Sequence, residues 1–269
     1  MPSSTETFQL SLQSAEMYES KFVPALFAEW AVRLVDLAGV TPGQTVLDVA
    51  CGTGIVARTV AERLQGRGAI VGLDCNDAML TVAARVRADV EWRRGDAGAL
   101  PFAERSFDVV LCQMALMFFP DRRAALGEMR RVVTGAGAVG LVVPAGLDAQ
   151  PAYGPFVEAA ARHAGPDAVS LLSTYWACGD RDALAALVES AGLRVDAFDT
   201  RVGTARFDSP DALVATEVES TPLVDRISDE VYRRIREDAR EALRPFTTPA
   251  GRLDAPLAAH VVLARRCAG

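Results

Sequence analysis

A chain of 269 residues, half of them hydrophobic, is long enough for one large α/β domain or for one domain with a lid. Its net charge of -7 argues against a nucleic-acid partner, because binding phosphates requires a basic surface. No apolar run approaches membrane-spanning length, and residues 1–6 lack the basic-then-apolar order of a signal peptide. The five cysteines show neither a C-x-x-C pair nor a zinc spacing. We therefore expect free thiols, no metal site and a cytoplasmic location.

Helical spacing of aromatic residues is the first pattern along the chain. Tyr18, Phe22 and Trp30 recur at helical intervals, and Pro24 interrupts the pattern. Such a stripe is typical of core or of a docking surface. The alternative is a helix that folds over a ligand.

A glycine turn then joins the first expected strand to a helix. The apolar run 46–50 contains one acid, Asp48, breaks at Gly52 and Gly54, and continues as a helical pattern over 55–64. Glycines let the backbone approach a ligand, and the first helical N–H groups point at it. The dinucleotide pattern G-x-G-x-x-G does not fit, because its third glycine is missing. A tight turn in any Rossmann-like sheet, without a ligand, is the alternative.

Two more acids follow the next expected strands. Asp74 ends the apolar run 69–74, about 20 residues beyond Gly54, where a ribose-binding carboxylate is expected in such folds. A carboxylate there can accept hydrogen bonds from both ribose hydroxyls, whereas the alternative is an N-cap for a helix near Asn76. Asp96 lies in the loop after the third strand. Its alternative role is to stabilise its own turn.

The fourth strand, 107–113, is nearly all apolar, as expected of a strand buried on both faces. Ligands of open parallel sheets lie at the carboxyl ends of strands, which places Gln113 and Met114 beside the ligand. The later pattern predicts strands over 138–143, 193–198 and 260–265, and charged helices over 211–217 and 229–243.

The glycine turn resembles the first motif of class I S-adenosylmethionine (SAM) methyltransferases. The string Asp48-Val49-Ala50-Cys51-Gly52-Thr53-Gly54 is especially similar to the subgroup of ubiquinone/menaquinone C-methyltransferases and actinobacterial small-molecule methyltransferases. The resemblance is strong over 42–143 and weaker over 175–266. It implies an α/β fold with a Rossmann-like, seven-stranded, mostly parallel sheet, helices on both faces and a helical lid or insert.

The resemblance also implies four parts of the chain. Residues 1–40 would form an N-terminal helical cover, and 41–144 the SAM-binding core. Residues 145–181 would form an insert or lid. Residues 182–269 would complete the sheet, with the helical insert 209–246 forming the substrate pocket.

Particular residues carry the expected SAM contacts. In the family the glycine turn packs against the methionine part of SAM, Asp74 binds the ribose, and Asp96 and the Ala97 N–H reach the adenine. Met79 is expected against the adenine, with an ordinary core role as the equal alternative. The residues expected to bind SAM are Tyr18, Phe22, Asp48, Ala50, Cys51, Gly52, Thr53, Gly54, Asp74, Cys75, Met79, Gly95, Asp96, Ala97, Gln113 and Met114. The candidates for the substrate pocket are Phe118, Tyr175 and Trp176.

The function that the resemblance implies is transfer of a methyl group from SAM to a small, largely apolar metabolite by in-line displacement. S-adenosyl-L-homocysteine would be the product of the cofactor. The alternatives are another reaction of bound SAM, such as a cyclisation or isomerisation, and a SAM-binding protein without catalysis. The two histidines, His163 and His260, are expected to be structural or solvent-facing, so no catalytic residue is assigned. We expect a small-molecule substrate, and a homodimer is left open.

Overall fold

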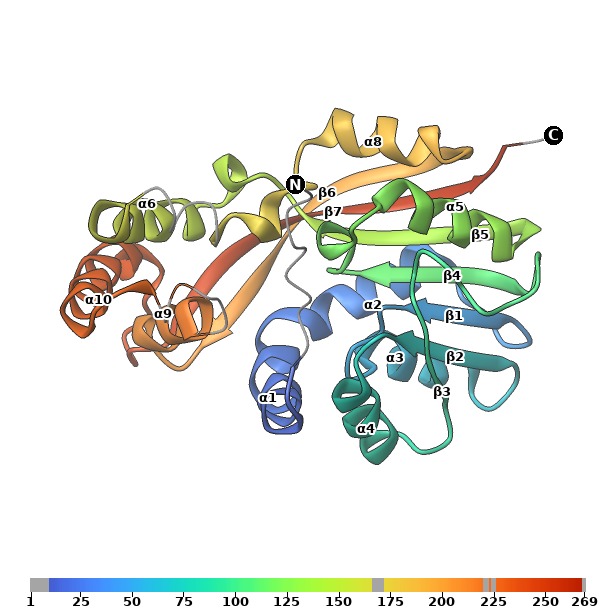
Figure 1. The fold of residues 1–269 in the computed structure, drawn as a ribbon, viewed down its shortest axis with the longest axis horizontal. Coiled ribbons are helices and arrows are strands. Elements are labelled where there is room, and N and C mark those ends of the chain that lie inside the picture. The colour runs from blue at the N-terminus through green and yellow to red at the C-terminus, as the bar shows by residue number, and fades with distance from the viewer. Residues whose placement is uncertain (1–9, 166–171, 220–222, 224–225, 268–269) are drawn as a thin grey trace. The chain divides into compact units, whose positions relative to one another are not determined.

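The computed structural model describes residues 10–165, 172–219, 223 and 226–267 (Figure 1). The chain divides into two compact units. The first unit comprises residues 1–143, 182–199 and 260–269, and the second comprises 144–181 and 200–259. Among the described residues, no helix combines the length and the apolar character needed to cross a bilayer.

A seven-stranded sheet forms the framework, in the order β3-β2-β1-β4-β5-β7-β6 (Figure 1). The pairs β1–β2, β1–β4, β2–β3 and β4–β5 are parallel. The strands are β1 (Thr45–Val49), β2 (Ala69–Asp74), β3 (Glu91–Arg94), β4 (Phe107–Gln113), β5 (Val133–Pro144), β6 (Leu193–Phe207) and β7 (Leu253–Arg266). This sheet confirms the predicted α/β, Rossmann-like fold class.

Helices connect the parallel strands, as right-handed crossovers require. The first unit contains α1 (Leu12–Met17), the π-helix η1 (Tyr18–Phe27), α2 (Ala28–Leu37), α3 (Ile55–Leu64), α4 (Asp77–Val86), α5 (Arg122–Val132) and α8 (Arg181–Ser190). The second unit contains α6 (Tyr153–Ala164), α9 (Pro210–Glu219) and α10 (Asp229–Leu243). Short 3₁₀ turns cover Leu116–Phe118, Leu147–Ala149, Thr174–Trp176 and Arg244–Phe246.

The N-terminal helical segment continues through the proline that interrupts its sequence pattern. Pro24 lies inside η1, a ten-residue π-helix. Proline lacks the N–H that an α-helix needs at an interior position, and a π-helical segment with its wider turns accommodates that loss. The helical segment therefore runs without a break into α2.

The last two strands are longer than their sequence patterns predict. β6 continues nine residues past the predicted end at 198, and β7 begins seven residues before the predicted start at 260. The added part of β6 has a long exposed stretch, 199–202, so it lacks the apolar alternation that marks a strand. The added part of β7 contains Pro256 and several alanines, which are poor strand formers. Apart from Asp199, both added parts belong to the second unit.

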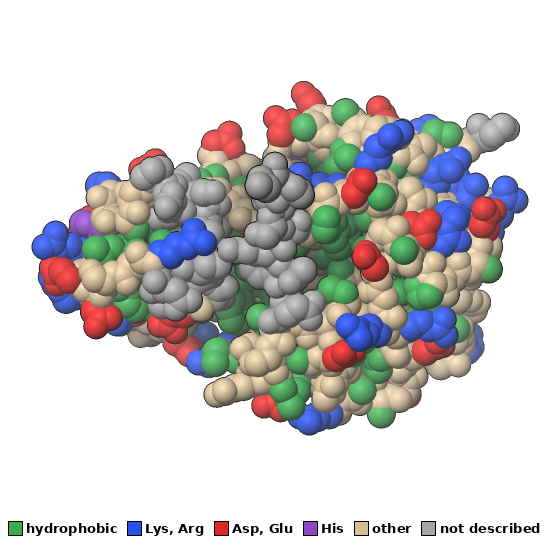
Figure 2. Space-filling view, in the orientation of Figure 1, with side chains coloured by type: hydrophobic (Ala, Val, Ile, Leu, Met, Phe, Trp, Pro, Cys, Tyr) green, Lys and Arg blue, Asp and Glu red, His purple; other side chains and the backbone are tan. Residues whose placement is uncertain are grey.

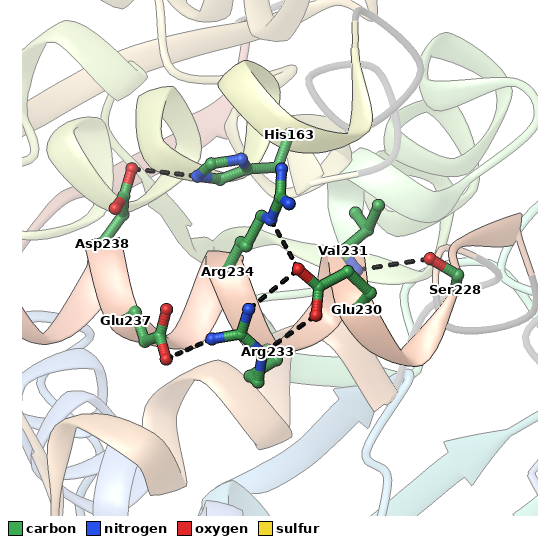
Figure 3. A network of polar contacts seen from close by, with 8 residues as sticks. All are labelled: His163, Ser228, Glu230, Val231, Arg233, Arg234, Glu237 and Asp238. Atoms are coloured by element: carbon green, nitrogen blue, oxygen red, sulfur yellow. Dashed lines mark hydrogen bonds and ion pairs between the residues drawn. The ribbon is translucent and has the colours of Figure 1, made fainter.

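The second unit is built around α10, which contacts both α6 and α9. The buried face of α10 carries Ile235, Ala239 and Leu243, and its outer face carries ion pairs (Figure 3). Arg233 bridges Glu230 and Glu237 along this outer face. Acidic and basic side chains intermix over the surface in view in Figure 2, as expected for a chain of modest net charge.

Candidate functional site

The turn between β1 and α3 departs from ordinary backbone geometry. Ala50, Gly52 and Gly54 all have positive φ, at 55°, 54° and 89°. A left-handed alanine is unfavourable by about 1 kcal/mol, and such residues concentrate at functional sites. Met114, directly after the neighbouring strand β4, has φ 51°. Two strained non-glycine residues therefore follow the carboxyl ends of two adjacent strands, where the sequence predicts a ligand.

Two buried acids hold this turn by main-chain hydrogen bonds. The Oδ2 atom of Asp48 accepts from the N–H of Ala57, the third residue of α3, at 3.0 Å. It thereby satisfies a helix-end donor that a capping side chain would otherwise take. Asp74 accepts from the N–H of Gly52 at 2.8 Å and from the N–H of Asn76 at 2.9 Å. The alternative role of Asp74 as N-cap of α4 is wrong, because Asn76 itself caps that helix.

Burial shifts both carboxyl groups toward the neutral form. Desolvation raises the pKa of Asp48 to about 8; the Ala57 N–H opposes the shift and the charge of Asp74 adds to it. Desolvation also raises the pKa of Asp74, against the hydrogen bonds from Asn76 and Gly52. A ligand that brings hydroxyl donors or a positive charge to this strand edge would favour the charged forms.

The cover segment η1 lies directly on the glycine turn. The ring of Tyr18 is 3.7 Å from the position that a Cβ atom on Gly52 would occupy. Tyr18 also stacks on Phe22 and Phe27, with ring centroids 5.8 and 5.3 Å away. Glu19 forms an ion pair with Arg58 of α3 at 3.0 Å. The structure therefore brings two predicted aromatic residues together over the predicted turn.

Packing inside the protein also explains why position 54 is a glycine. A Cβ atom on Gly54 would lie 2.2 Å from the ring of Trp92 on β3, and one on Gly72 would lie 2.4 Å from the same ring. The N–H of Gly54 donates to the carbonyl of Cys51 at 2.8 Å. The packing of Trp92, as well as any ligand, thus requires glycine at this position.

Three buried polar atoms near the turn have no partner among the described residues. They are Thr53 Oγ1, Gln113 Oε1 and Glu19 Oε2. The amide nitrogen of Gln113 is used, because it donates to the carbonyl of Phe27 at 3.1 Å. A buried polar atom without a partner costs about 1–3 kcal/mol, so a ligand group is the expected partner. Oxygen acceptors of this kind fit the ammonium end of SAM.

Asp96 stabilises its own turn, as its alternative role predicts. Its Oδ1 atom accepts from the N–H of Gly98 at 2.8 Å, and its carbonyl accepts from Ala99. Asp96 is exposed and Ala97 is buried. The second carboxylate oxygen of Asp96 has no protein partner among the described residues, so a contact with adenine stays a prediction.

Met79 packs in the protein core near the cover. It is 8% exposed and lies in a cluster with Ala15 and Val82, against which Tyr18 also packs. Met79 therefore has the core role given as its alternative. A contact of the same side chain with adenine stays a prediction. Cys75, which directly follows Asp74 at the end of β2, is exposed.

The substrate-pocket candidates fall in different units. Phe118 belongs to the first unit, whereas Tyr175 and Trp176 belong to the second. Trp176 contacts Tyr153 edge to face, with ring centroids 5.2 Å apart. The Nε1 atom of Trp176 is buried without a partner in the described part of the chain.

Both histidines have structural surroundings. His163 Nε2 lies 2.9 Å from Asp238 Oδ2 and links α6 to α10 (Figure 3). His260 is 4% exposed, and its ring packs edge to face on Phe198 at 5.2 Å. In the described ranges, no three His, Cys, Asp or Glu side chains form a metal-binding group.

The sequence interpretation missed Glu217, which lies within a helix assigned to a solvated, charged face. Glu217 is only 8% exposed. Desolvation raises its pKa to about 7, and a hydrogen bond with Tyr153 offsets part of that shift. The missed signal is spacing: Leu213 and Val214 are fully buried, and an acid four and three residues after them shares their face.

Comparisons with known proteins agree on the glycine-turn region. Residues 46–137 match the family model described as a methyltransferase domain. The demethylmenaquinone methyltransferase of Renibacterium salmoninarum is 42% identical over 127 residues, which are 47% of this chain and 51% of that protein. The nocamycin O-methyltransferase of Saccharothrix syringae is 37% identical over 123 residues, 44% of each chain. The chain thus spans about half the length of these curated relatives.

Solved structures extend the likeness in fold to most of the chain. The crystal structure of the [4+2]-cyclase SpnF superposes with a TM-score of 0.54 at 18% identity, covering 90% of this chain and 82% of that one. At this identity the likeness concerns the fold alone. The same fold therefore occurs in a protein named for a reaction other than methyl transfer.

Proposed function

We propose, from the methyltransferase domain model that residues 46–137 match, that this protein is a class I SAM-dependent methyltransferase and that it transfers a methyl group from SAM to a small, largely apolar metabolite. The observation that carries the proposal is the glycine turn held by Asp48 and Asp74 and covered by Tyr18. Bound SAM would supply a methyl group on a positively charged sulfur. The protein's own contribution is to bind, orient and exclude water.

Asp74 would bind the ribose hydroxyls. Each carboxylate oxygen has about two acceptor positions, and the two oxygens together accept from the main-chain N–H groups of Gly52, Asn76 and Cys75. The acceptor capacity that remains is assigned to a ribose. Added hydrogen bonds from the hydroxyls would favour the charged form that burial disfavours.

The methionine end of SAM would lie among the unpartnered oxygens. Gln113 Oε1 and Thr53 Oγ1 are acceptors that a protonated amine would satisfy. The electron-rich ring face of Tyr18 suits a neighbouring positive charge, which gives the aromatic cover a binding role. Asp96 and Ala97 would recognise the adenine.

The class of acceptor follows from the relatives' names and from the second unit. One relative is named for demethylmenaquinone and another is named as an O-methyltransferase of nocamycin, both small molecules. Tyr175 and Trp176 would supply apolar wall to such an acceptor. Binding of such an acceptor would depend more on the apolar surface that it buries than on charge.

Mass spectrometry of the purified protein, with calorimetry against SAM, tests the proposal. We expect SAM to bind, and incubation with cell extract and methyl-labelled SAM to release S-adenosylhomocysteine and label an extract metabolite. NAD is the control, because the glycine spacing is wrong for a dinucleotide. Absence of SAM binding would contradict the proposal. Binding without labelling would contradict methyl transfer and favour another use of the bound cofactor.

A further inference from the structure

The second unit contains a buried carboxyl group that the cofactor site does not use. Glu217 lies on α9, between residues whose side chains form the apolar face of that helix. Only 8% of the residue is exposed. A carboxylate is rarely buried to this extent without a charged partner, and no ion pair of Glu217 exists among the described residues. Its burial therefore calls for a functional explanation.

Two tyrosines surround this carboxyl group. Tyr153 of α6 is 3% exposed and hydrogen-bonds to Glu217, and the charge of Glu217 also acts on Tyr175. Burial, followed by this charge, raises the pKa of both phenols, so neither is a source of negative charge near pH 7. Aromatic rings and one proton acceptor thus form a single cluster.

The other charged groups near α9 are already paired with one another. α10 packs against α9, and its Arg236 and Arg240 both bind Asp211, each at 2.8 Å. Tyr232 of α10 donates to Glu219 at 2.8 Å. These charged groups are therefore engaged elsewhere. Burial raises the pKa of Glu217 and the hydrogen bond with Tyr153 lowers it.

An unpartnered donor lies in the same cluster. Trp176 packs edge to face on Tyr153, and its Nε1 atom is buried with no partner in the described ranges. Indole N–H is a donor only, so its expected partner is an acceptor atom of a ligand. Tyr175 and Trp176 are half-buried, so the cluster is not sealed from the surface of the second unit.

We propose that Glu217, Tyr153 and Trp176 form a site of the second unit that binds a hydroxyl on an aromatic ring, a group that the proposed acceptor would carry. The inference rests on the proposed function. Glu217 accepts the hydroxyl hydrogen bond, the Trp176 N–H meets a second oxygen, and the aromatic rings contact the ring. An isolated aliphatic alcohol would not use the two ring contacts.

Glu217 would also take the proton of the bound acceptor. The acceptor O–H bond breaks, the proton joins a carboxylate oxygen of Glu217, and the electron pair stays on the acceptor oxygen. The electron pair makes that oxygen more nucleophilic, and the proton later leaves from Glu217 to solvent. A base with a pKa of about 7 is suited to this role near neutral pH.

Paired ligands that differ only in the proton test this inference. The full chain is titrated with 1-naphthol and with 1-methoxynaphthalene, in which a methyl ether replaces the hydroxyl. We expect 1-naphthol to bind at least tenfold more tightly at pH 8. The preference should fall toward pH 6 as Glu217 becomes protonated, since 1-naphthol itself stays protonated over this range.

Matched variants separate a proton acceptor from a structural acid. Glu217→Gln keeps the shape and an acceptor oxygen but has neither the charge nor a proton to exchange, so the preference for 1-naphthol should fall several-fold and its pH dependence should disappear. Glu219→Gln, on the same helix and exposed, should retain both. Tyr153→Phe should lower the affinity for each of the two naphthalenes. That loss should be smaller than the loss of 1-naphthol affinity caused by Glu217→Gln.

Three outcomes would overturn the inference: no binding of either naphthalene by the wild type, equal binding of the two, or a Glu217→Gln variant that behaves as the wild type. SAM affinity is measured for every variant. Unchanged SAM binding shows that the first unit of each variant is folded. Loss of SAM binding by the wild type would count against the proposed function, whereas the naphthalene titrations count only for or against the acceptor site.

Discussion

Asp74 illustrates how one side chain can serve both the fold and a ligand. Its two oxygens hold Gly52 and Asn76, and its remaining acceptor positions are assigned to a ribose. Replacement of Asp74 by alanine should weaken SAM binding at least tenfold, about 1.4 kcal/mol, because charge-assisted hydrogen bonds are lost. Calorimetry measures the change. Asp77→Ala, an exposed acid that begins α4, should change SAM affinity little, and equal affinities of both variants would remove Asp74 from the site.

Gly54 gives a prediction about stability instead of binding. Gly54→Ala would place a Cβ atom 2.2 Å from Trp92 in a backbone with φ 89°. Gly66→Ala is the control, because Gly66 also has positive φ, 72°, but no atom lies within 4 Å of its Cβ position. Both variants carry the left-handed strain of about 1 kcal/mol, and Gly54→Ala adds an overpacking cost of about 1–3 kcal/mol.

Urea unfolding of the two glycine variants isolates the steric part. If Gly54→Ala and Gly66→Ala lose the same unfolding free energy, the close packing of Trp92 on the turn is contradicted. A double-mutant cycle with Trp92→Leu checks this contact. Gly54→Ala should lower the free energy of unfolding less in the Trp92→Leu background than in the wild type. Such non-additivity is expected only for residues in contact.

Single residues also show what a sequence reveals about a site. The turn at Asp48, Gly52 and Asp74 could be predicted because it depends on main-chain geometry at strand ends, which the local sequence determines, whereas the ligand contacts of these residues stay a prediction. Glu217 could not be found in the same way. Its burial depends on α6, α10 and residues 174–176 meeting around α9, and a charged residue on a helix usually faces solvent.

At the scale of elements, a side-chain amide extends the edge of a strand in the second unit. Gln150 is 2% exposed, donates to the carbonyls of Ala145 and Ala258, and accepts from the N–H of Ala258 at 3.0 Å. It thus pairs with β7 as a neighbouring strand would. Gln150→Ala removes the side-chain partner of the Ala258 N–H and of the Ala145 carbonyl, whereas the Ala258 carbonyl keeps the Ala145 N–H, and the variant should destabilise the protein by about 2–4 kcal/mol.

Thermal and urea unfolding measure the effect of Gln150→Ala. Gln13→Ala, at an exposed position of α1, is the matched control and should change stability by less than about 0.5 kcal/mol. A Gln150 variant as stable as the Gln13 variant would show that water replaces the amide without cost. The alternation of apolar residues predicts nothing about this contact, because its partners are far apart in the sequence.

Strand length was predicted less well than strand existence, for a related reason. The parallel strands β1, β2 and β4 are buried on both faces, so their ends coincide with the ends of apolar runs. The outer half of β6 begins with the exposed stretch 199–202, and the outer half of β7 mixes buried residues with Pro256 and alanines, so neither shows a continuous apolar run. Hydrophobic periodicity detects strands by a regular run or alternation of apolar residues, and it misses strand ends where exposed residues, proline or alanine interrupt that pattern.

For the whole molecule, buried acids with raised pKa values link stability to pH. Asp48, with a folded pKa of about 8 against an ordinary value of 3.8, binds a proton in the folded state that the unfolded chain releases above pH 4. Its contribution is fully present below pH 4 and is lost as pH rises through 8. Glu217, with a folded pKa of about 7, acts in the same direction.

The free energy of unfolding without SAM should therefore fall from pH 5 to pH 8, by on the order of 1 kcal/mol per pH unit for each such group. The acids whose pKa values are lowered, such as Glu230, change charge below this window and do not contribute to the slope. Asp48→Asn keeps an oxygen that can accept from the Ala57 N–H but has no proton to exchange. Urea unfolding at several pH values should give a shallower slope for Asp48→Asn than for the wild type, whereas Asp77→Asn should keep the wild-type slope. Equal slopes for all three would mean that Asp48 titrates as an exposed acid does, and that the turn is held without burying a protonated carboxyl group.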